Sequence, residues 1–435
     1  MFLRFKPFTL YDNINFMRYY STRNKTTGVS FAVAALEGLA PDGGLYIPEE
    51  IPQFKEAVKS SLGTMDLADV GFETIRPWVG EDIPDSVLND LVHSAFSFPA
   101  PLVKAGDRKV LELFHGPTAA FKDFGARFMA RAFSYLRRGE DKPLKILVAT
   151  SGDTGGAVAD GFYGVEGISV SVLYPKGRVS PLQERQIAGL KGNITAFAVE
   201  GSFDDCQYLV KQAFGDKELS RDMSSANSIN ISRLIPQAVY YAAAAGQSPT
   251  AVFSVPSGNF GNLTAGLYAY KMGAPIGKFI AAANINKTVP DYLESGRYEA
   301  RSPRATLSNA MDVGAPSNFE RMAAHFSWEQ MRLLILGASV TDDEVLKTIS
   351  ETFSRCGYYL EPHSAVGWRA VDKCSGLLTK ENPVVVSTAH PAKFAETVEP
   401  LTGPVLVPPS LQKAMERTVE AITIPAKLEA LKECL

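Results

Sequence analysis

The chain has 435 residues, of which 46% are hydrophobic, and its 44 basic and 47 acidic side chains give a formal net charge of -3. A chain of this length and composition buries a large core and divides into two or three domains. It contains no basic block of the kind that follows a nucleic-acid backbone and no stretch near the roughly 20 apolar residues that a membrane helix needs. We therefore expect neither a nucleic acid nor a membrane as a partner.

The cysteines and the N-terminus bear on location. Cys206, Cys356, Cys374 and Cys434 lie far apart and form no CxxC pair, which predicts no metal site, no disulfide framework and a reducing, cytoplasmic location. The opening "MFLRFKPFTLYDNINF" lacks the continuous apolar centre of a secretory signal. Because Met17 opens "MRYYSTRN", residues 1–16 are either the product of an upstream start or an arm, amphipathic or poorly ordered. The sequence leaves these alternatives open.

The predicted elements change in character near residue 100. Up to that point helices are expected near 30–38 and 84–95, with the turn-rich "LAPDGGLYIP" between extended pieces. Beyond it, short apolar and β-branched runs alternate with amphipathic segments, the runs being "KILVAT", "ISVSVLYP", "NITAFAVEG", "TAVFSVP" and "KFIAAAN". This alternation predicts an α/β fold with open sheets of parallel strands joined by crossover helices.

Two shorter signals concern helices. Ser202 is followed three places later by Asp205, an acidic variant of the capping box that predicts a helix beginning there. The run "AAAA" at 242–245 predicts a closely packed helix. Neither signal carries chemistry.

Two loops that follow predicted strands are candidate binding loops. "SGDTGG" at 151–156 follows "KILVAT", and "SGNFGN" at 257–262 follows "TAVFSVP". Ligands bind at the carboxyl ends of strands in open α/β sheets, and small residues before a helix leave backbone N–H groups free for an anion. A plain glycine turn is the alternative for either loop. Neither matches the P-loop or GxGxxG pattern, so a nicotinamide dehydrogenase ranks last among the alternatives.

Lys122, in "HGPTAAFKDFG", is the candidate reactive residue. A lysine beside Asp123 is ordinarily a solvated pair, but Phe121 and Phe124 flank these two residues, and desolvation would lower the pKa of the amine and favour a nucleophile or base. A reactive lysine with two anion-holding loops is the minimum equipment of a pyridoxal-phosphate enzyme.

Longer motifs carry a resemblance to a known family. They are "VSFAVAALEGLAPDGGLYIP", "LELFHGPTAAFKDFG", "ATSGDTGGAVA", "LYPKGRVSPLQE", "NSINISRLIPQ", "VPSGNFGN", "TLSNAMDVGAPSNFER" and "STAHPAKF". In this order they closely resemble the threonine synthases, which are fold-type II pyridoxal-phosphate enzymes. The resemblance runs from about Met17 to near residue 400, and leaves residues 1–16 and the C-terminal tail outside.

The resemblance implies a division of the chain. We expect an N-terminal α+β domain at 1–100 and two open parallel-sheet α/β domains. The large, cofactor-binding one is formed by 101–145 and 230–405, the small one by 146–229, and 406–435 form a C-terminal tail.

The resemblance also implies roles for single residues. Lys122 matches the Schiff-base lysine, Thr388 the hydroxyl that bonds the ring nitrogen, and Asp153 a position near the ring hydroxyl. A neutral partner such as Thr388 does not hold the ring nitrogen protonated as a carboxylate would. The loop that cradles the cofactor phosphate is matched by Gly258, Asn259, Phe260, Gly261 and Asn262, and the substrate carboxylate loop by Ser151 and Thr154.

The implied reaction converts O-phospho-L-homoserine and water into L-threonine and phosphate, with Lys122 also moving the Cα proton. Candidates that hold the leaving phosphate are the cations Lys176, Arg178, Arg233 and Lys393 and the neutral donors Asn227 and Asn230; for each, a surface charge or structural hydrogen bond is the alternative. We expect His115 and His390 to be structural, and the protein to be a monomer or homodimer. A related phospho-lyase and a non-catalytic metabolite-binding homologue remain alternatives.

Overall fold

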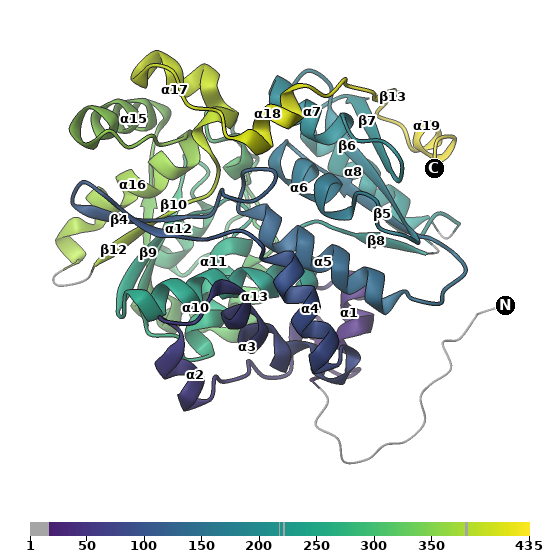
Figure 1. Cartoon of the computed structure of the whole chain (residues 1–435), viewed down its shortest axis with the longest axis horizontal. Coiled ribbons are helices and arrows are strands. Elements are labelled where there is room, and N and C mark those ends of the chain that lie inside the picture. Colours follow the sequence, from purple (N-terminus) through teal and green to yellow (C-terminus); the bar gives the residue numbers. More distant parts are fainter. Residues whose placement is uncertain (1–16, 217, 221, 379–381) are drawn as a thin grey trace.

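The computed structural model describes residues 17–216, 218–220, 222–378 and 382–435. The alternatives for residues 1–16 therefore lie outside the described residues. Two larger sheets occupy the two halves of the molecule, and the N-terminal helices α2, α3 and α4 gather along one side (Figure 1). Among the described residues, no helix combines the length and apolar character needed to cross a bilayer.

The N-terminal part contains a small antiparallel ribbon and four helices. The ribbon pairs β1 (Tyr19–Ser21) with β2 (Tyr46–Pro48). The helical elements are α1 (Phe31–Glu37), α2 (Glu56–Ser61), α3 (Leu67–Val79), η1 (Gly80–Asp82) and α4 (Asp85–Ala95). The helices predicted near 30–38 and 84–95 are thus confirmed. Trp78 of α3 stacks on Tyr268 with ring centroids 5.2 Å apart. The N-terminal part therefore shares a hydrophobic core with the domain that contains the six-stranded sheet.

The six-stranded sheet has the order β11-β10-β9-β12-β4-β3. Its strands are β3 (Leu102–Ala105), β4 (Arg108–Glu112), β9 (Ala251–Pro256), β10 (Ile276–Ala283), β11 (Ile335–Ser339) and β12 (Pro383–Ser387). All neighbours are parallel except the edge pair β3 and β4. All six residues of β9 are buried, which explains why it reads as a continuous apolar run.

Further helices accompany this sheet. They are α5 (Lys122–Leu136), α9 (Ile231–Leu234), η2 (Ile235–Gln237), α10 (Ala238–Gln247), α11 (Gly261–Lys271), α12 (Thr288–Ser295), η3 (Asn309–Met311), α13 (Phe319–His325), α14 (Trp328–Leu334), α15 (Asp342–Cys356), α16 (Pro362–Cys374), η4 (Ser375–Leu377), η5 (Pro391–Phe394) and α17 (Ala395–Thr402). The alanine run lies in α10 and is buried throughout, as predicted. Helix α5 contacts both α4 and α6 (Asp153–Phe162).

The five-stranded sheet has the order β13-β7-β6-β5-β8 and is parallel throughout. Its strands are β5 (Leu144–Ala149), β6 (Ile168–Pro175), β7 (Ile194–Glu200), β8 (Met223–Ser225) and β13 (Ile422–Pro425). Besides α6, the helices here are α7 (Pro181–Ala188), α8 (Phe203–Gly215), α18 (Pro409–Met415) and α19 (Leu428–Lys432). The Ser202 and Asp205 capping box begins α8 as predicted.

The segment that we set apart as a tail takes part in this sheet. Strand β13 pairs with β7 over four residues, from Ile422 with Phe197 to Pro425 with Glu200. Strand β5 begins at Leu144, just before the predicted limit after residue 145. The chain thus returns from the six-stranded sheet to close the edge of the five-stranded one.

Candidate active site

Three loops meet at one edge of the six-stranded sheet. Strands β4, β12 and β9 are neighbours and parallel, so the loops after them emerge at the same edge. Backbone bonds tie two of these loops together, because Phe121 N–H donates to Thr388 O at 2.8 Å and His390 N–H donates to Ala119 O at 3.0 Å. Lys122 begins α5 directly after this junction.

Lys122 stands in a desolvated position without a salt-bridge partner. Its amine makes no hydrogen bond or ion pair with the part of the chain that the structure describes, and it lies 5.4 Å from the ring centroid of Phe121. Burial lowers the pKa of Lys122; Asp153 opposes this lowering and Lys393 adds to it. An amine of lowered pKa is available as a nucleophile or base.

Asp123 does not form the solvated pair that was the alternative for Lys122. Its buried carboxylate accepts hydrogen bonds from Thr118 N–H at 2.9 Å and from Thr118 Oγ1 at 2.5 Å. Burial raises the pKa of Asp123 to about 6. A β-carbon at Gly116 would collide with this carboxylate, so the loop before Lys122 is closely packed.

The loop at 257–262 has the features of an anion cradle. Phe260 adopts the left-handed conformation, with φ 59°, immediately before α11. A β-carbon at Gly258 would lie 2.6 Å from the Cα of Met311, so only glycine fits there. The N–H groups of Gly258, Asn259 and Phe260 donate to no described residue, and those of the first turn of α11 have no intrahelical partner. These free donors fit a phosphate group.

The two asparagines of this loop position its backbone. Asn259 donates to Ser228 Oγ and accepts from Ser317 N–H, both at 2.5 Å. The Oδ1 of Asn262 accepts from the hydroxyls of Tyr240 at 2.6 Å and Tyr241 at 2.8 Å, while its Nδ2 is buried without a partner. Neighbouring elements thus fix the shape of the cradle.

The loop at 151–156 presents two hydroxyls and a helix N-terminus. Thr150 Oγ1 accepts from the N–H groups of Gly152 at 3.0 Å and Gly155 at 2.8 Å, which shapes the turn into α6. The hydroxyls of Ser151 and Thr154 bond to none of the described residues, and both residues are part-buried. They are free to bind a ligand.

Asp153 and Lys393 join the two sheets. The Nζ of Lys393, in η5 after β12, lies 2.8 Å from Asp153 Oδ1 at the start of α6, and donates to Thr118 O at 2.8 Å. Gln183 donates to the same Asp153 oxygen at 3.0 Å. Burial acts to raise the pKa of Asp153, but Lys393 and Lys122 outweigh it, and the pKa lies well below its ordinary value.

The residues predicted to hold the leaving phosphate differ in burial: some lie inside the protein and others on its surface. Arg233 is buried, and burial lowers its pKa to about 10; it donates to Ala226 O at 2.5 Å, while its Nε has no partner among the described residues. Asn227 has a buried, unpartnered Oδ1. Lys176 and Arg178 are exposed after β6, Lys176 lying 3.5 Å from Glu200.

Asn230 has no donor left for a ligand. Its amide donates to Ala35 O at 2.8 Å and Ser225 O at 3.0 Å, and its oxygen accepts from Ser232 N–H at 2.9 Å as the N-cap of α9. We therefore leave Asn230 out of the proposed phosphate site.

The two histidines near Lys122 have structural partners. His115 Nε2 lies 2.7 Å from Glu112 Oε2. His390 Nδ1 accepts from Ala392 N–H at 3.2 Å, and burial, with a contribution from His115, lowers the pKa of His390 to about 4.

Sequence reasoning missed Glu361, which lies behind Thr388. Thr388 Oγ1 is 3.4 Å from Glu361 Oε1, and Glu361 is fully buried at the start of α16. The signal was present in "EPHS", an acidic N-cap before a proline at the first helical position. Nothing in the sequence marks its proximity to Thr388.

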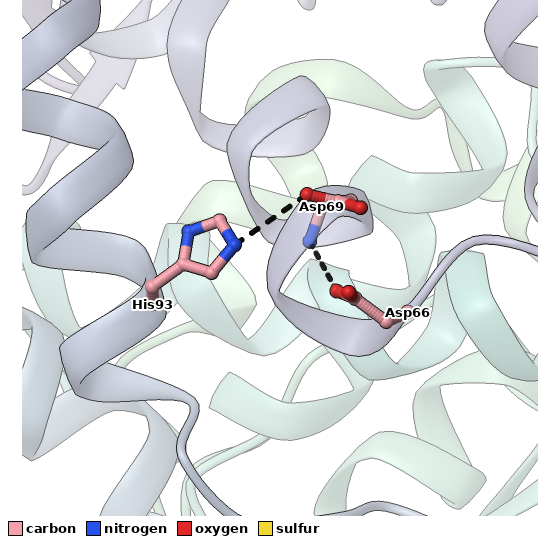
Figure 2. A group of neighbouring side chains, drawn as sticks. All are labelled: Asp66, Asp69 and His93. Atoms are coloured by element: carbon pink, nitrogen blue, oxygen red, sulfur yellow. Dashed lines mark hydrogen bonds and ion pairs between the residues drawn. The ribbon is translucent and has the colours of Figure 1, made fainter.

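One exposed group of carboxylates and a histidine lies on the N-terminal helices. Figure 2 shows His93 of α4 reaching toward Asp69 of α3, their Nε2 and Oδ1 atoms 3.5 Å apart. Asp66 accepts from Asp69 N–H at 2.9 Å as the N-cap of α3. Helix capping and an exposed ion pair explain these contacts, so we assign the group no function.

Comparison with known families covers almost the whole chain. The description "Threonine synthase N terminus" matches residues 18–96, "Pyridoxal-phosphate dependent enzyme" matches 109–389, and "Threonine synthase, C-terminal" matches 364–435. The chain belongs to the threonine synthase family. The prediction that the resemblance ends near residue 400 was wrong, since the third match reaches the last residue.

Similar proteins of this family include the threonine synthases of Escherichia coli and Saccharomyces cerevisiae. The first is 43% identical over 428 residues, 96% of this chain and 99% of the relative; the second is 37% identical over 456 residues, 87% and 88% of the two chains. Solved structures of the Escherichia coli enzyme and of PLP-bound threonine synthase from Brucella melitensis both superpose with a TM-score of 0.89. They are 43% and 37% identical and cover 96% of this chain and 99% and 98% of theirs.

The predicted cofactor and fold class of this threonine synthase family member are thereby confirmed. It is a fold-type II pyridoxal-phosphate enzyme. The desolvated amine of Lys122 and the free donors of the 257–262 loop fit the aldehyde and the phosphate of that cofactor.

Proposed function

We propose that this chain converts O-phospho-L-homoserine and water into L-threonine and phosphate. Its relatives named threonine synthase support this reaction. The observation that carries it is the unpaired, desolvated amine of Lys122 beside two loops with free donors. The test is incubation of the cofactor-loaded protein with phosphohomoserine: equal release of phosphate and threonine supports the proposal. Phosphate without threonine would indicate the phospho-lyase alternative, and neither product a binding homologue.

When bound, pyridoxal phosphate supplies an electron sink for the negative charge that develops at the substrate Cα. Lys122 is the attachment residue. The backbone of the loop formed by Gly258, Asn259, Phe260, Gly261 and Asn262 holds the cofactor phosphate. Thr388 would face the ring nitrogen and Asp153 the ring hydroxyl; the ion pair of Asp153 with Lys393 keeps this carboxylate negatively charged there.

Lys122 also moves protons. Since burial lowers its pKa, the neutral amine is available to take the Cα proton and to hold it at Nζ for delivery to a neighbouring carbon. One base then serves several steps.

Two groups of residues bind the substrate in this proposal. The free hydroxyls of Ser151 and Thr154 and the N-terminus of α6 bind the carboxylate. Arg233, with its buried unpartnered Nε–H, and the amide N–H₂ of Asn227 bind the leaving phosphate; the unpartnered Oδ1 of Asn227 is an acceptor and takes no part. Lys176 and Arg178 are exposed, and we propose that they reach the leaving phosphate through closure of the domain that bears the 151–156 loop over the bound substrate.

The remaining proposals concern state and location. We infer a monomer or homodimer in the cytoplasm. The location is supported by the four cysteines, all of which are free thiols. The large domain is proposed to comprise 101–143 and 230–405, and the small domain 144–229 together with β13, because β5 begins at Leu144.

A further inference from the structure

Glu361 is a fully buried carboxylate at the N-cap of α16. It accepts four close hydrogen bonds, from His363 N–H at 2.8 Å, His363 Nδ1 at 2.6 Å, Ser364 N–H at 2.7 Å and Ser364 Oγ at 2.6 Å. No lysine or arginine of the described residues lies within ion-pair distance of it. Because an ionised carboxylate only accepts hydrogen bonds, this ring of donors suits a negative charge.

The hydrogen bonds around Glu361 determine which atom donates the proton in each contact. Ser364 gives its hydroxyl proton to Glu361, so its oxygen accepts from Ser387 Oγ at 2.9 Å and from Thr388 N–H at 3.3 Å. His363 Nε2 accepts from Ala310 N–H at 3.2 Å, so its Nδ1 carries the proton and the ring is neutral. The negative charge of Glu361 is therefore not cancelled within this cluster.

The remaining neighbour of Glu361 is the hydroxyl of Thr388. Its Oγ1 lies 3.4 Å from Glu361 Oε1, and a hydroxyl has one proton to donate. When that proton points to Glu361, the lone pairs of Thr388 face the other way. Glu361 also opposes the lowering of the pKa of Lys122, so its charge is felt where the chemistry takes place.

We propose that Glu361 is a positioning residue that acts through Thr388 on the ring nitrogen of the cofactor. It holds the Thr388 proton, so Thr388 accepts a hydrogen bond from the ring nitrogen and favours its protonated form. This inference rests on the proposed role of Thr388. It revises the expectation that a neutral partner leaves the nitrogen unprotonated, because the hydroxyl has a carboxylate behind it. A protonated ring is the stronger electron sink.

The test loads the holoenzyme with pyridoxal phosphate labelled with ¹⁵N in the ring and reads the nitrogen signal by NMR at fixed pH. In the unaltered protein we expect the signal of a protonated nitrogen, and the signal of an unprotonated nitrogen would overturn the proposal without any variant. In Glu361→Gln the ratio of protonated to unprotonated nitrogen should fall roughly 3- to 10-fold, the value of one ordinary hydrogen bond, because the Thr388 to Glu361 contact of 3.4 Å is longer than a charge-assisted one.

Two further variants separate this role from helix capping. Thr388→Val should shift the signal as Glu361→Gln does, and adding Glu361→Gln to it should change little, since the effect passes through the hydroxyl. Thr388→Ser, which keeps the hydroxyl that Thr388→Val removes, should give the same nitrogen signal as the unaltered protein. Asp66→Ala, which removes the exposed N-cap of α3, should lower stability by about 1 kcal/mol without moving the signal. An unshifted signal in folded Glu361→Gln would show that Glu361 only caps α16.

The outcomes also separate this inference from the proposed function. If the protein makes threonine and Thr388→Val shifts the signal while Glu361→Gln does not, only the role of Glu361 is lost. If Thr388→Val leaves the signal unchanged, the proposed contact of Thr388 is wrong, and the inference with it. If Glu361→Gln does not fold, Glu361→Asp takes its place, because it keeps a carboxylate for the N-cap and withdraws it from Thr388; an unshifted signal in Glu361→Asp overturns the role of Glu361.

Discussion

The buried ion pair between Lys393 and Asp153 should stabilise the contact between the two sheets. The side chains are 0% and 6% exposed and their charged atoms are 2.8 Å apart, so solvent screens them little. Replacing Lys393 by Met leaves Asp153 with the amide of Gln183 as its hydrogen-bond donor and with Lys122, which makes no ion pair with it, as the remaining nearby positive charge. Breaking a buried pair from one side destabilises a protein by about 3–5 kcal/mol, because a charge is left uncompensated.

The value of the pair itself comes from a double-mutant cycle with Lys393→Met and Asp153→Asn. At 2.8 Å the Coulomb attraction is about 6 kcal/mol for an effective dielectric constant of 20, which sets a ceiling. We expect a coupling energy of about 3 kcal/mol, with the double variant more stable than the sum of the single effects implies. The assay is urea unfolding of the cofactor-free chain, because bound cofactor would add stability by mass action.

A matched control is the pair of Lys59 and Glu56, which are 2.7 Å apart but have side chains 30% and 88% exposed. Its coupling energy should be at most about 0.5 kcal/mol and should fall with added salt, whereas the buried coupling should not. If the buried pair coupled no more strongly than this exposed one, the reasoning from burial would be refuted.

Three further predictions concern the site. Lys122→Ala should retain pyridoxal phosphate through the 257–262 loop but lose threonine formation by at least about 10²–10⁴-fold; a near-parental rate would contradict the role of the lysine. Gly258→Ala should weaken cofactor binding in equilibrium dialysis, because its β-carbon would lie 2.6 Å from the Cα of Met311; equal retention would count against the cradle. Asp123 has a pKa raised to about 6, so its folded form binds the proton more tightly, and its effect on stability is absent below pH 4 and fully unfavourable above pH 6. Unfolding free energy should fall by about 3 kcal/mol across that window, and Asp123→Asn should remove this component; an unchanged pH profile would refute it.

The strands that the sequence predicted share one physical property. They lie inside parallel sheets and are covered on both faces, so each forms a continuous apolar run that can be recognised from its own residues. These strands are β5, β6, β7, β9 and β10. β13 escaped prediction because it is a four-residue edge strand with one buried residue, Ile424. Its pairing with β7 depends on residues more than 200 positions away, which no local pattern records.

The candidate site divides in the same way. Lys122 and the glycines of the strand-end loops could be found because small residues beside a strand end are a local signal. The partners that set their chemistry are distant: Lys393 meets Asp153 across 240 positions and binds Thr118 across 275. The sequence also does not show that the amide of Asn230 is used within the fold, since its partner Ala35 lies 195 positions away.

A residue that tunes a buried site can therefore be hidden in the sequence, because its local pattern is already explained by another function. Glu361 reads as an N-cap and performs that function, because it accepts from His363 and Ser364 N–H groups. An ionised carboxylate has about four acceptor positions, and capping uses only part of them. The remainder bonds the Ser364 hydroxyl and reaches toward Thr388. Serine or asparagine at this N-cap would satisfy the same N–H groups without burying a charge. A charged and fully buried N-cap residue such as Glu361 is therefore a sign that the carboxylate has a second role in the neighbouring site.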